Sequence, residues 1–315
     1  MALSNSVCFS ATAHPASLWR PPVSTPVAAP APAPAHAAAP AAPAHAAAAD
    51  PARATALAPR GLAAFLVIAF AFSWGVWWAG SAFLPGSPMP AVIAGGFGPA
   101  VAAVAVTLAT EGLSGAGALF RRYSPRRRGW FAALGATVLV LAAIAGSAAV
   151  PLYLGTAALD TEALRAAAVL APVNLLVIAL AGGGNEELGW RGFALPRLQG
   201  ALPPVAANTV LGAVWAVWHA PLFTMAGTVQ SEIAFPAYAL LCVGLTVVLG
   251  YVFNATRGGV LLAVAAHAAV NVVTGLKGTA VGDAAGVGEV AFVALAALVL
   301  VALTRGRLGL RPLRA

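Results

Sequence analysis

Side chains that can carry acid–base or metal chemistry gather in the second half of the chain. Glu186 and Glu187 are adjacent, and Arg191 follows Glu187 by four positions. Of the five histidines, only His219 and His267 lie beyond the first 45 residues, and each sits inside an apolar stretch. Ionisable groups within apolar segments are costly and need a partner or a function. These side chains are therefore the first candidates for a site.

The spacing of the two acids predicts different roles for them. On a helix, Glu187 and Arg191 share a face, whereas Glu186 points about 100° away. We therefore expect an ion pair between Glu187 and Arg191. A carboxylate without such a partner in a low-dielectric site can act as a general base, and we expect this of Glu186. In the alternative interpretation, all three residues lie at a helix end among the lipid headgroups.

Each of the two histidines has a companion one helical turn away. Trp215 precedes His219 by four positions, where its ring could fix the imidazole and keep water scarce. Asn271 follows His267 by four positions, so both side chains project from one face. A lone histidine in a membrane helix most often forms a hydrogen bond to a neighbouring helix. Three polar positions on three apolar segments favour a functional site instead.

Membrane-spanning helices must position these residues. The 315-residue chain is 61% hydrophobic and 8% charged, with a mean hydropathy of +0.88, which is too apolar for a water-soluble fold. Apolar stretches of roughly 18–25 residues follow Gly61, long enough to cross a hydrocarbon core of about 30 Å as helices. We expect an all-α, polytopic transmembrane bundle of about eight helices. Their ranges are 61–84, 90–110, 130–154, 166–186, 204–225, 233–253, 258–276 and 287–304.

Three regions follow from this pattern. Residues 1–58 are rich in Ala and Pro without a hydrophobic period, so we expect a disordered tail. Residues 61–304 form the transmembrane helical domain, and residues 305–315 form a basic tail that we expect in the cytoplasm.

The distribution of charge predicts the orientation. If the N-terminus is cytoplasmic, the inner loops contain every Lys and Arg except Arg165 and Lys277, while Glu289 and other acids fall in the outer loops. The positive-inside rule thus predicts an integral protein of the plasma (inner) membrane with both termini cytoplasmic. The basic residues lie between apolar segments rather than on one soluble face, which argues against nucleic-acid binding. The lipid bilayer is the expected partner.

The chemically capable residues form three ordered motifs that resemble those of the CPBP family, which includes CAAX proteases and bacteriocin-processing or Abi-type membrane proteins. The motifs are Glu186-Glu187-x-x-x-Arg191, Trp215-x-x-x-His219 and His267-x-x-x-Asn271. The resemblance covers about residues 168–275, which we take as a CPBP-like core. One departure is Trp215, because Phe is usual at that position in the family, and the larger ring could reshape the pocket.

The resemblance implies an intramembrane endopeptidase that hydrolyses a membrane-associated peptide or protein near the cytoplasmic side. Glu186 and His219 would activate a water molecule, while His267 and Asn271 would stabilise the oxyanion. The expected role of Glu187, Arg191 and Trp215 is to shape the site.

Other functions remain open from sequence alone. No cofactor is favoured, but zinc is possible, with Glu186, His219 and His267 as ligands of a metalloprotease. A noncatalytic immunity or scaffold protein could retain the motifs as structure. A proton- or metal-linked transporter is a further alternative, although the chain has no recognisable repeat.

Overall fold

The computed structural model describes residues 51–84, 86–125, 128–181, 183–282 and 286–310. Within these ranges the chain forms helices and no β-strand, which confirms the predicted all-α fold. Helix α1 (Pro51–Phe83) begins inside the range 1–58 that the sequence analysis assigned to a tail. The remaining residues of that range, 1–50, lie outside the described part of the chain.

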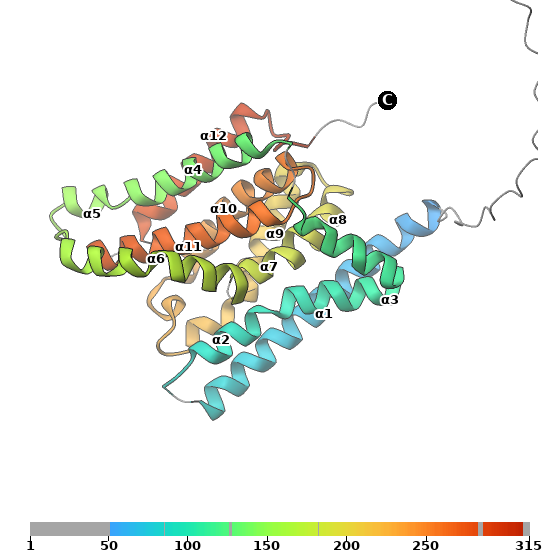
Figure 1. The fold of residues 1–315 in the computed structure, drawn as a ribbon, viewed down its shortest axis with the longest axis horizontal. Helices are drawn as coiled ribbons and strands as arrows, with labels where there is room; N and C mark the ends of the chain where they lie inside the picture. Colours follow the sequence, from blue (N-terminus) through green and yellow to red (C-terminus); the bar gives the residue numbers. More distant parts are fainter. Residues whose placement is uncertain (1–50, 85, 126–127, 182, 283–285, 311–315) are drawn as a thin grey trace, which may run out of the picture. The chain divides into compact units, whose positions relative to one another are not determined.

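The helices follow one another with short connections (Figure 1). After α1 come α2 (Met89–Gly96), α3 (Gly98–Phe120), η1 (Arg121–Tyr123), α4 (Trp130–Gly146), α5 (Ala149–Tyr153), α6 (Thr161–Ala181), α7 (Gly183–Gly189), η2 (Trp190–Ala194), α8 (Leu195–Gln199), α9 (Pro204–Trp218), η3 (Ala220–Thr224), η4 (Val229–Glu232), α10 (Phe235–Ala255), α11 (Leu261–Val281) and α12 (Val287–Leu303).

Seven segments of the described chain are long and apolar enough to cross a membrane, so this is an integral membrane protein. They are Gly61–Phe83, Met89–Tyr123, Trp130–Tyr153, Thr161–Gln199, Pro204–Thr224, Phe235–Ala255 and Leu261–Val281. The eighth predicted helix is present as α12, which has only 17 residues. At 1.5 Å per residue it is about 26 Å long, slightly short of the hydrocarbon thickness.

The fourth span is longer than the sequence analysis predicted. We expected it to end at residue 186, where two adjacent carboxylates interrupt the apolar run. Instead, the helical path continues to Gln199 through α7, η2 and α8. The prediction failed because the two acids have buried partners and so do not mark the water boundary. Glu186 and Glu187 consequently lie inside the bundle rather than at its edge.

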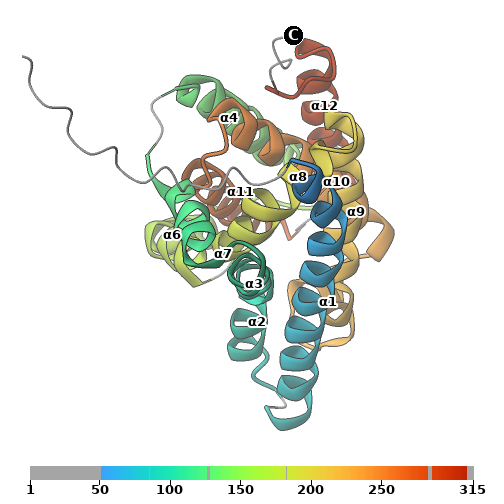
Figure 2. The same ribbon diagram turned by 90° about the vertical axis from the view of Figure 1, so that its right-hand side faces the viewer.

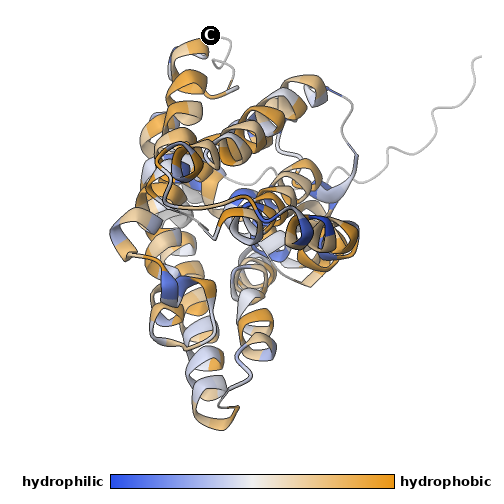
Figure 3. Ribbon diagram, turned by 90° about the vertical axis from the view of Figure 1, so that its left-hand side faces the viewer, coloured by the Kyte–Doolittle hydropathy of each residue, from blue (hydrophilic) through white to orange (hydrophobic). Residues whose placement is uncertain are grey.

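Helix α7 lies at the centre of the packing, in contact with α3, α6 and α11 (Figures 1 and 2). Helix α1 packs along α3, and α10 packs against α9, α12 and α4. Hydrophobic residues predominate along these helices (Figure 3). The three segments that carry the motifs, α7 with η2, α9 and α11, are therefore held between helices that themselves face lipid.

Small residues bring α9 and α10 close together. A Cβ added to Gly212 would overlap the backbone of Val243, and one added to Gly250 would overlap the side-chain amide of Asn208. Glycine permits such close helix contacts in membranes. The approach fixes the position of α9, whose C-terminal end carries His219.

Tryptophan residues fix the end of α9 from the other side. The Trp74 indole N–H donates to the carbonyl of Trp218 at 2.9 Å, which ties α1 to the last residue of α9. The rings of Trp77 and Trp218 have their centroids 4.8 Å apart. Aromatic packing of this kind stabilises buried contacts beyond simple area burial.

Lys277 and Glu289 lie deeper than the sequence analysis assigned them. We placed Lys277 in an outer loop, just past the predicted range 258–276, but it lies within α11; Glu289 lies in the first turn of α12, inside the predicted range 287–304, and both are buried. Lys277 Nζ is 2.9 Å from Glu289 Oε2, and Thr274 donates to Glu289 Oε1 at 2.9 Å. The mutual neutralisation of the two charges explains why neither residue ended its helix at the water boundary.

The orientation of the chain in the membrane stays a prediction, and the side of its C-terminus depends on whether the short α12 crosses the bilayer. Eight crossings place the C-terminus on the same side as the N-terminus, whereas seven crossings place it opposite. Reporter fusions at Ser124, after the second span, and after Ala315 should both read cytoplasmic, because the loop and tail at these points are rich in arginine. An external signal only at Ala315 would show that α12 does not cross, and one at Ser124 would overturn the orientation.

Candidate active site

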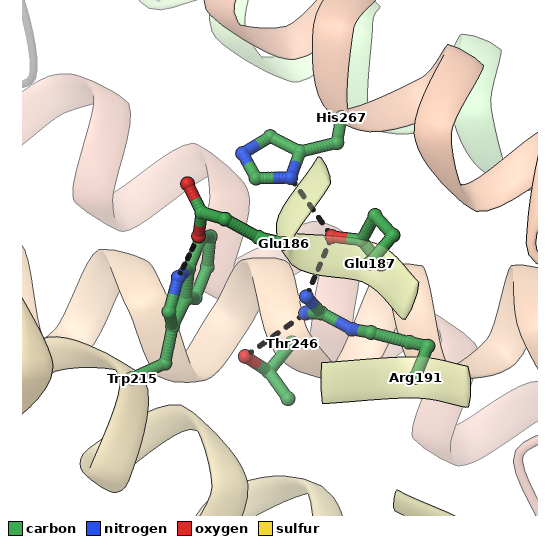
Figure 4. Close-up of polar contacts among 6 residues, drawn as sticks. All are labelled: Glu186, Glu187, Arg191, Trp215, Thr246 and His267. Atoms are coloured by element: carbon green, nitrogen blue, oxygen red, sulfur yellow. Dashed lines mark hydrogen bonds and ion pairs between the residues drawn. The ribbon is translucent and has the colours of Figure 1, made fainter. Parts of the chain in front are cut away.

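One carboxylate oxygen holds two basic side chains at the centre of the bundle (Figure 4). Glu187 Oε1 accepts hydrogen bonds from Arg191 Nη1 at 2.7 Å and from His267 Nδ1 at 2.8 Å. Arg191 Nη2 donates to Thr246 Oγ1 at 3.3 Å. Glu187 and Arg191 are fully buried. The Glu187–Arg191 pair expected from the spacing is present, and it also connects α7 to α10 and α11.

The local backbone places Arg191 within an unusual turn. Residues Trp190–Ala194 form a π-helix between α7 and α8, and such insertions occur frequently at functional sites. Gly189 packs directly on α3, because an added Cβ would overlap the Pro99 carbonyl. This close contact and the wider turn allow the Arg191 side chain to lie under Glu187 and beside the Trp215 ring, 5.1 Å from its centroid.

Glu186 faces a different partner from its neighbour. Its Oε2 accepts a hydrogen bond from Trp215 Nε1 at 2.7 Å, and its Oε1 points away from Trp215 (Figure 4). The predicted division between the two acids is thus visible in their contacts: Glu187 is bound to Arg191 and Glu186 is not. The Trp215 ring also packs edge-on against the His219 imidazole, with centroids 5.6 Å apart, as the sequence analysis expected.

Trp215 also fixes His219 through its backbone. His219 follows the last residue of α9, and its Nδ1 lies 2.9 Å from the Trp215 carbonyl oxygen. A carbonyl can only accept, so Nδ1 carries the proton and Nε2 of the neutral ring has a lone pair. The rings of Trp77, Trp218 and Tyr238 surround the imidazole. This enclosure keeps its orientation fixed.

A cavity of about 410 Å³ connects the motif residues. Glu186, His219, His267 and Asn271 all line it, together with Trp215. His267, Asn271 and the cavity-lining Thr274 follow one another along one face of α11. The structure therefore brings together every residue that the sequence analysis assigned to catalysis. Their chemical roles remain proposals.

The remaining wall of the cavity is mainly apolar and comes from several helices. Val92 and Ile93 of α2, Ile178 of α6, and Leu241 and Leu245 of α10 line it. Such a lining, with a few converging polar groups, is typical of a ligand site.

The donor atoms do not form a ligand set for a metal. Among the described residues, no group of three or more His, Cys, Asp or Glu side chains is placed to hold a metal ion. Trp215 binds one oxygen of Glu186, while Nδ1 of His267 binds Glu187 and Nδ1 of His219 binds a backbone carbonyl. These contacts do not use Glu186 Oε1, His219 Nε2 or His267 Nε2, and an outer hydrogen bond at Nδ1 is common for metal-bound histidine. Metal independence therefore stays a prediction.

Two contributors to the site were missed from sequence. Thr246 lies inside the apolar α10 and binds Arg191, and Tyr238 packs its ring against His219 at 5.3 Å. A polar residue within an apolar span is a recognisable signal, so Thr246 could have been singled out. Tyr238 lies near the start of its helix, and nothing in its spacing distinguishes it.

Comparison with known proteins points to the same part of the chain. Residues 168–273 match the family model described as type II CAAX prenyl endopeptidase Rce1-like. A segment of 105 residues is 28% identical to CAAX prenyl protease 2 of Methanococcus maripaludis. Both matches support the resemblance of this segment to the CPBP family. The matched segment is 31% of this chain and spans 39% of the length of that relative, and the family match includes all three motifs.

The Glu187 network makes a stability prediction. Arg191→Ala would leave a buried carboxylate without its main cation, so we expect a loss of about 3–5 kcal/mol and a lower folded yield. Arg197→Ala is the matched control, because its pair with Glu111 is partly exposed and is expected to contribute about 0–1 kcal/mol. Thermal unfolding in detergent measures both. Equal destabilisation by the two substitutions would contradict a central role for the buried pair.

Proposed function

We propose that this protein is an intramembrane endopeptidase of the CAAX type that acts on a membrane-associated peptide or protein. The observation that carries the proposal is the double role of Trp215. Its indole holds Glu186 and its carbonyl holds His219, so the carboxylate and imidazole are fixed on one cavity. The family match of residues 168–273 supports the same reaction class.

Glu186 is the general base of the proposed reaction. Its oxygen opposite Trp215 accepts a proton from a water molecule, while Nε2 of His219 accepts a hydrogen bond from the same water and orients it. The water oxygen attacks the scissile carbonyl carbon, and the carbonyl oxygen becomes an oxyanion. Glu186 then gives the proton to the departing amine as the C–N bond breaks. The proton and the electron pairs balance without a cofactor.

His267 and Asn271 are the proposed oxyanion donors. Because Nδ1 of His267 donates to Glu187, donation to an oxyanion requires a second proton on Nε2, and therefore an imidazolium. Glu187 accepts from this ring and from Arg191, so it offsets only part of that charge. The Asn271 side-chain amide, one turn along α11, supplies a neutral donor. Donors aimed at developing charge are among the strongest contributions to catalysis.

The surroundings of the site support an apolar substrate. The mainly apolar cavity wall accommodates hydrophobic residues or a lipid group next to the scissile bond. The relative from M. maripaludis has a name that specifies a prenylated substrate. For this protein we propose cleavage near the cytoplasmic side of the plasma (inner) membrane, as the resemblance to the CPBP family implies; the positive-inside pattern predicts the orientation of the chain.

The most informative test of this function is Glu186→Gln. The amide oxygen of Gln can still accept from Trp215, so the fold should persist, while loss of the base should lower turnover by about 10²–10⁴. The measurement is mass-spectrometric detection of fragments from CAAX peptides, with and without a prenyl group, incubated with purified protein. Glu111→Gln is the control for an acid outside the site. Full activity of Glu186→Gln would refute the mechanism, and a wild-type protein without activity would favour the noncatalytic alternative.

A second prediction concerns the position of His267. A Cβ added to Gly183 would lie 2.5 Å from His267 Nε2, so Gly183→Ala should displace the imidazole. We expect turnover to fall about 10²-fold, as for a misplacement of about 1 Å. Gly275→Ala lies on the same cavity, but its added Cβ would meet no atom within 4 Å, so it should keep activity. If Gly183→Ala and Gly275→Ala were equally active, the position of His267 would not affect turnover, which would contradict its role as an oxyanion donor.

Metal independence is a third prediction. Asn271→Ala should lower turnover by about 10²–10³ through loss of an oxyanion donor, and a chelator should leave the wild-type rate unchanged. Metal analysis of the active protein completes the measurement. Stoichiometric zinc that is lost with activity on chelation and restores activity when added back would contradict this account. Glu186, His219 and His267 would then be the candidate ligands.

A further inference from the structure

A second cavity lies at the ends of the membrane spans, apart from the residues of the proposed active site. It has a volume of about 810 Å³, within the size range of ligand pockets. Gln199 and Ala255, the last residues of two spans, line it, as does Arg122 in the last turn of a third. The 21-residue span Phe235–Ala255 is about as long as the hydrocarbon is thick, so its end at Ala255 places the cavity at the level of the lipid headgroups.

Three guanidinium groups from separate segments converge on this cavity. Arg122 belongs to η1, Arg128 precedes α4, and Arg257 lies in the turn between α10 and α11. No lining residue in the described part of the chain is acidic. A guanidinium presents its N–H donors in a planar fork that matches phosphate geometry. The cavity is therefore suited to an anion with several acceptor oxygens.

The backbone around the cavity fixes these arginines. A Cβ added to Gly129 would overlap the Ala255 carbonyl, so the segment that carries Arg128 packs directly on the end of α10. Arg257 has a φ of 56°, a left-handed conformation that usually favours Gly or Asn. Arg122 is held by a 3.4 Å hydrogen bond to the Gly258 carbonyl.

We propose that this cavity binds the phosphate group of an anionic membrane lipid. The location at headgroup level favours a lipid over a free ion, and Phe253 and Leu310 give the wall apolar surface for the carbon atoms next to the phosphate. The positive-inside rule explains why arginines lie on this side of the membrane, but it does not explain their convergence. Arg121, Arg305 and Arg307 are exposed on the same side and do not line the cavity.

Native mass spectrometry of the purified full-length protein tests the proposal, with phosphatidylglycerol, phosphatidylcholine or inorganic phosphate as the added probe. The cavity variant combines Arg122→Gln, Arg128→Gln and Arg257→Gln. The control combines Arg121→Gln, Arg305→Gln and Arg307→Gln, which removes the same charge from exposed positions. We expect wild type and control to bind phosphatidylglycerol alike, and the cavity variant to bind it at least about tenfold more weakly, as loss of a charged hydrogen bond implies.

Three results would overturn the proposal. If both triple variants bound phosphatidylglycerol equally weakly, the loss would be due to surface charge alone. Equal binding of phosphatidylcholine would remove the preference for an anionic lipid, and binding of inorganic phosphate at least as tight as that of phosphatidylglycerol would assign the cavity to a free ion. If the triple variant fails to fold, Arg128→Gln against Arg121→Gln provides the comparison, because both side chains are exposed. The readout is independent of proteolysis.

Discussion

The site depends on a carboxylate that is buried inside the membrane bundle. Glu187 Oε1 accepts from both Arg191 and His267, and the side chains of Glu187 and Arg191 have no exposed surface. An ionised group in an apolar interior is strongly unfavourable without hydrogen bonds and a counter-charge. Helices α7 and α11 must therefore keep their register, and the Arg191–Thr246 hydrogen bond adds α10 to the same assembly.

This constraint gives two neighbouring acids opposite environments. Glu187 turns toward the basic side chains, and Glu186 turns toward Trp215 and the cavity. A catalytic carboxylate must remain available for proton transfer, which a carboxylate paired with Arg191 is not. Both acids lie in α7, where adjacent side chains point about 100° apart, so the helix itself presents them in this way. In the proposed mechanism, Glu187 maintains the geometry and Glu186 moves the proton.

Local chemistry in the sequence was enough to predict much of this arrangement. The lengths of the apolar runs predicted the all-α fold and the eight helices. The four-residue spacing between Glu187 and Arg191 predicted their ion pair. Long-range contacts were not predictable, because a spacing along one helix does not say which helix faces it. The Glu187–His267 hydrogen bond, the contact of Trp215 with Glu186, and the contribution of Thr246 are all of this kind.

The errors have the same origin. The fourth span was ended too early and Lys277 was placed in a loop, because each apolar run was ended next to a charged residue. A charge whose partner lies on another part of the fold can instead remain inside the bundle. The burial of these pairs therefore follows only from the three-dimensional packing of the helices.

The central claim is that Glu186 and His219 lie on one side of the scissile bond, with His267 and Asn271 at the carbonyl oxygen. An experimental structure of the Glu186→Gln protein with an uncleaved peptide bound measures this directly. The account predicts the carbonyl oxygen about 2.7–3.1 Å from His267 Nε2 and the Asn271 amide nitrogen, with the carbonyl carbon facing position 186. A carbonyl oxygen remote from both donors, or a metal ion held by His219 and His267, would contradict it.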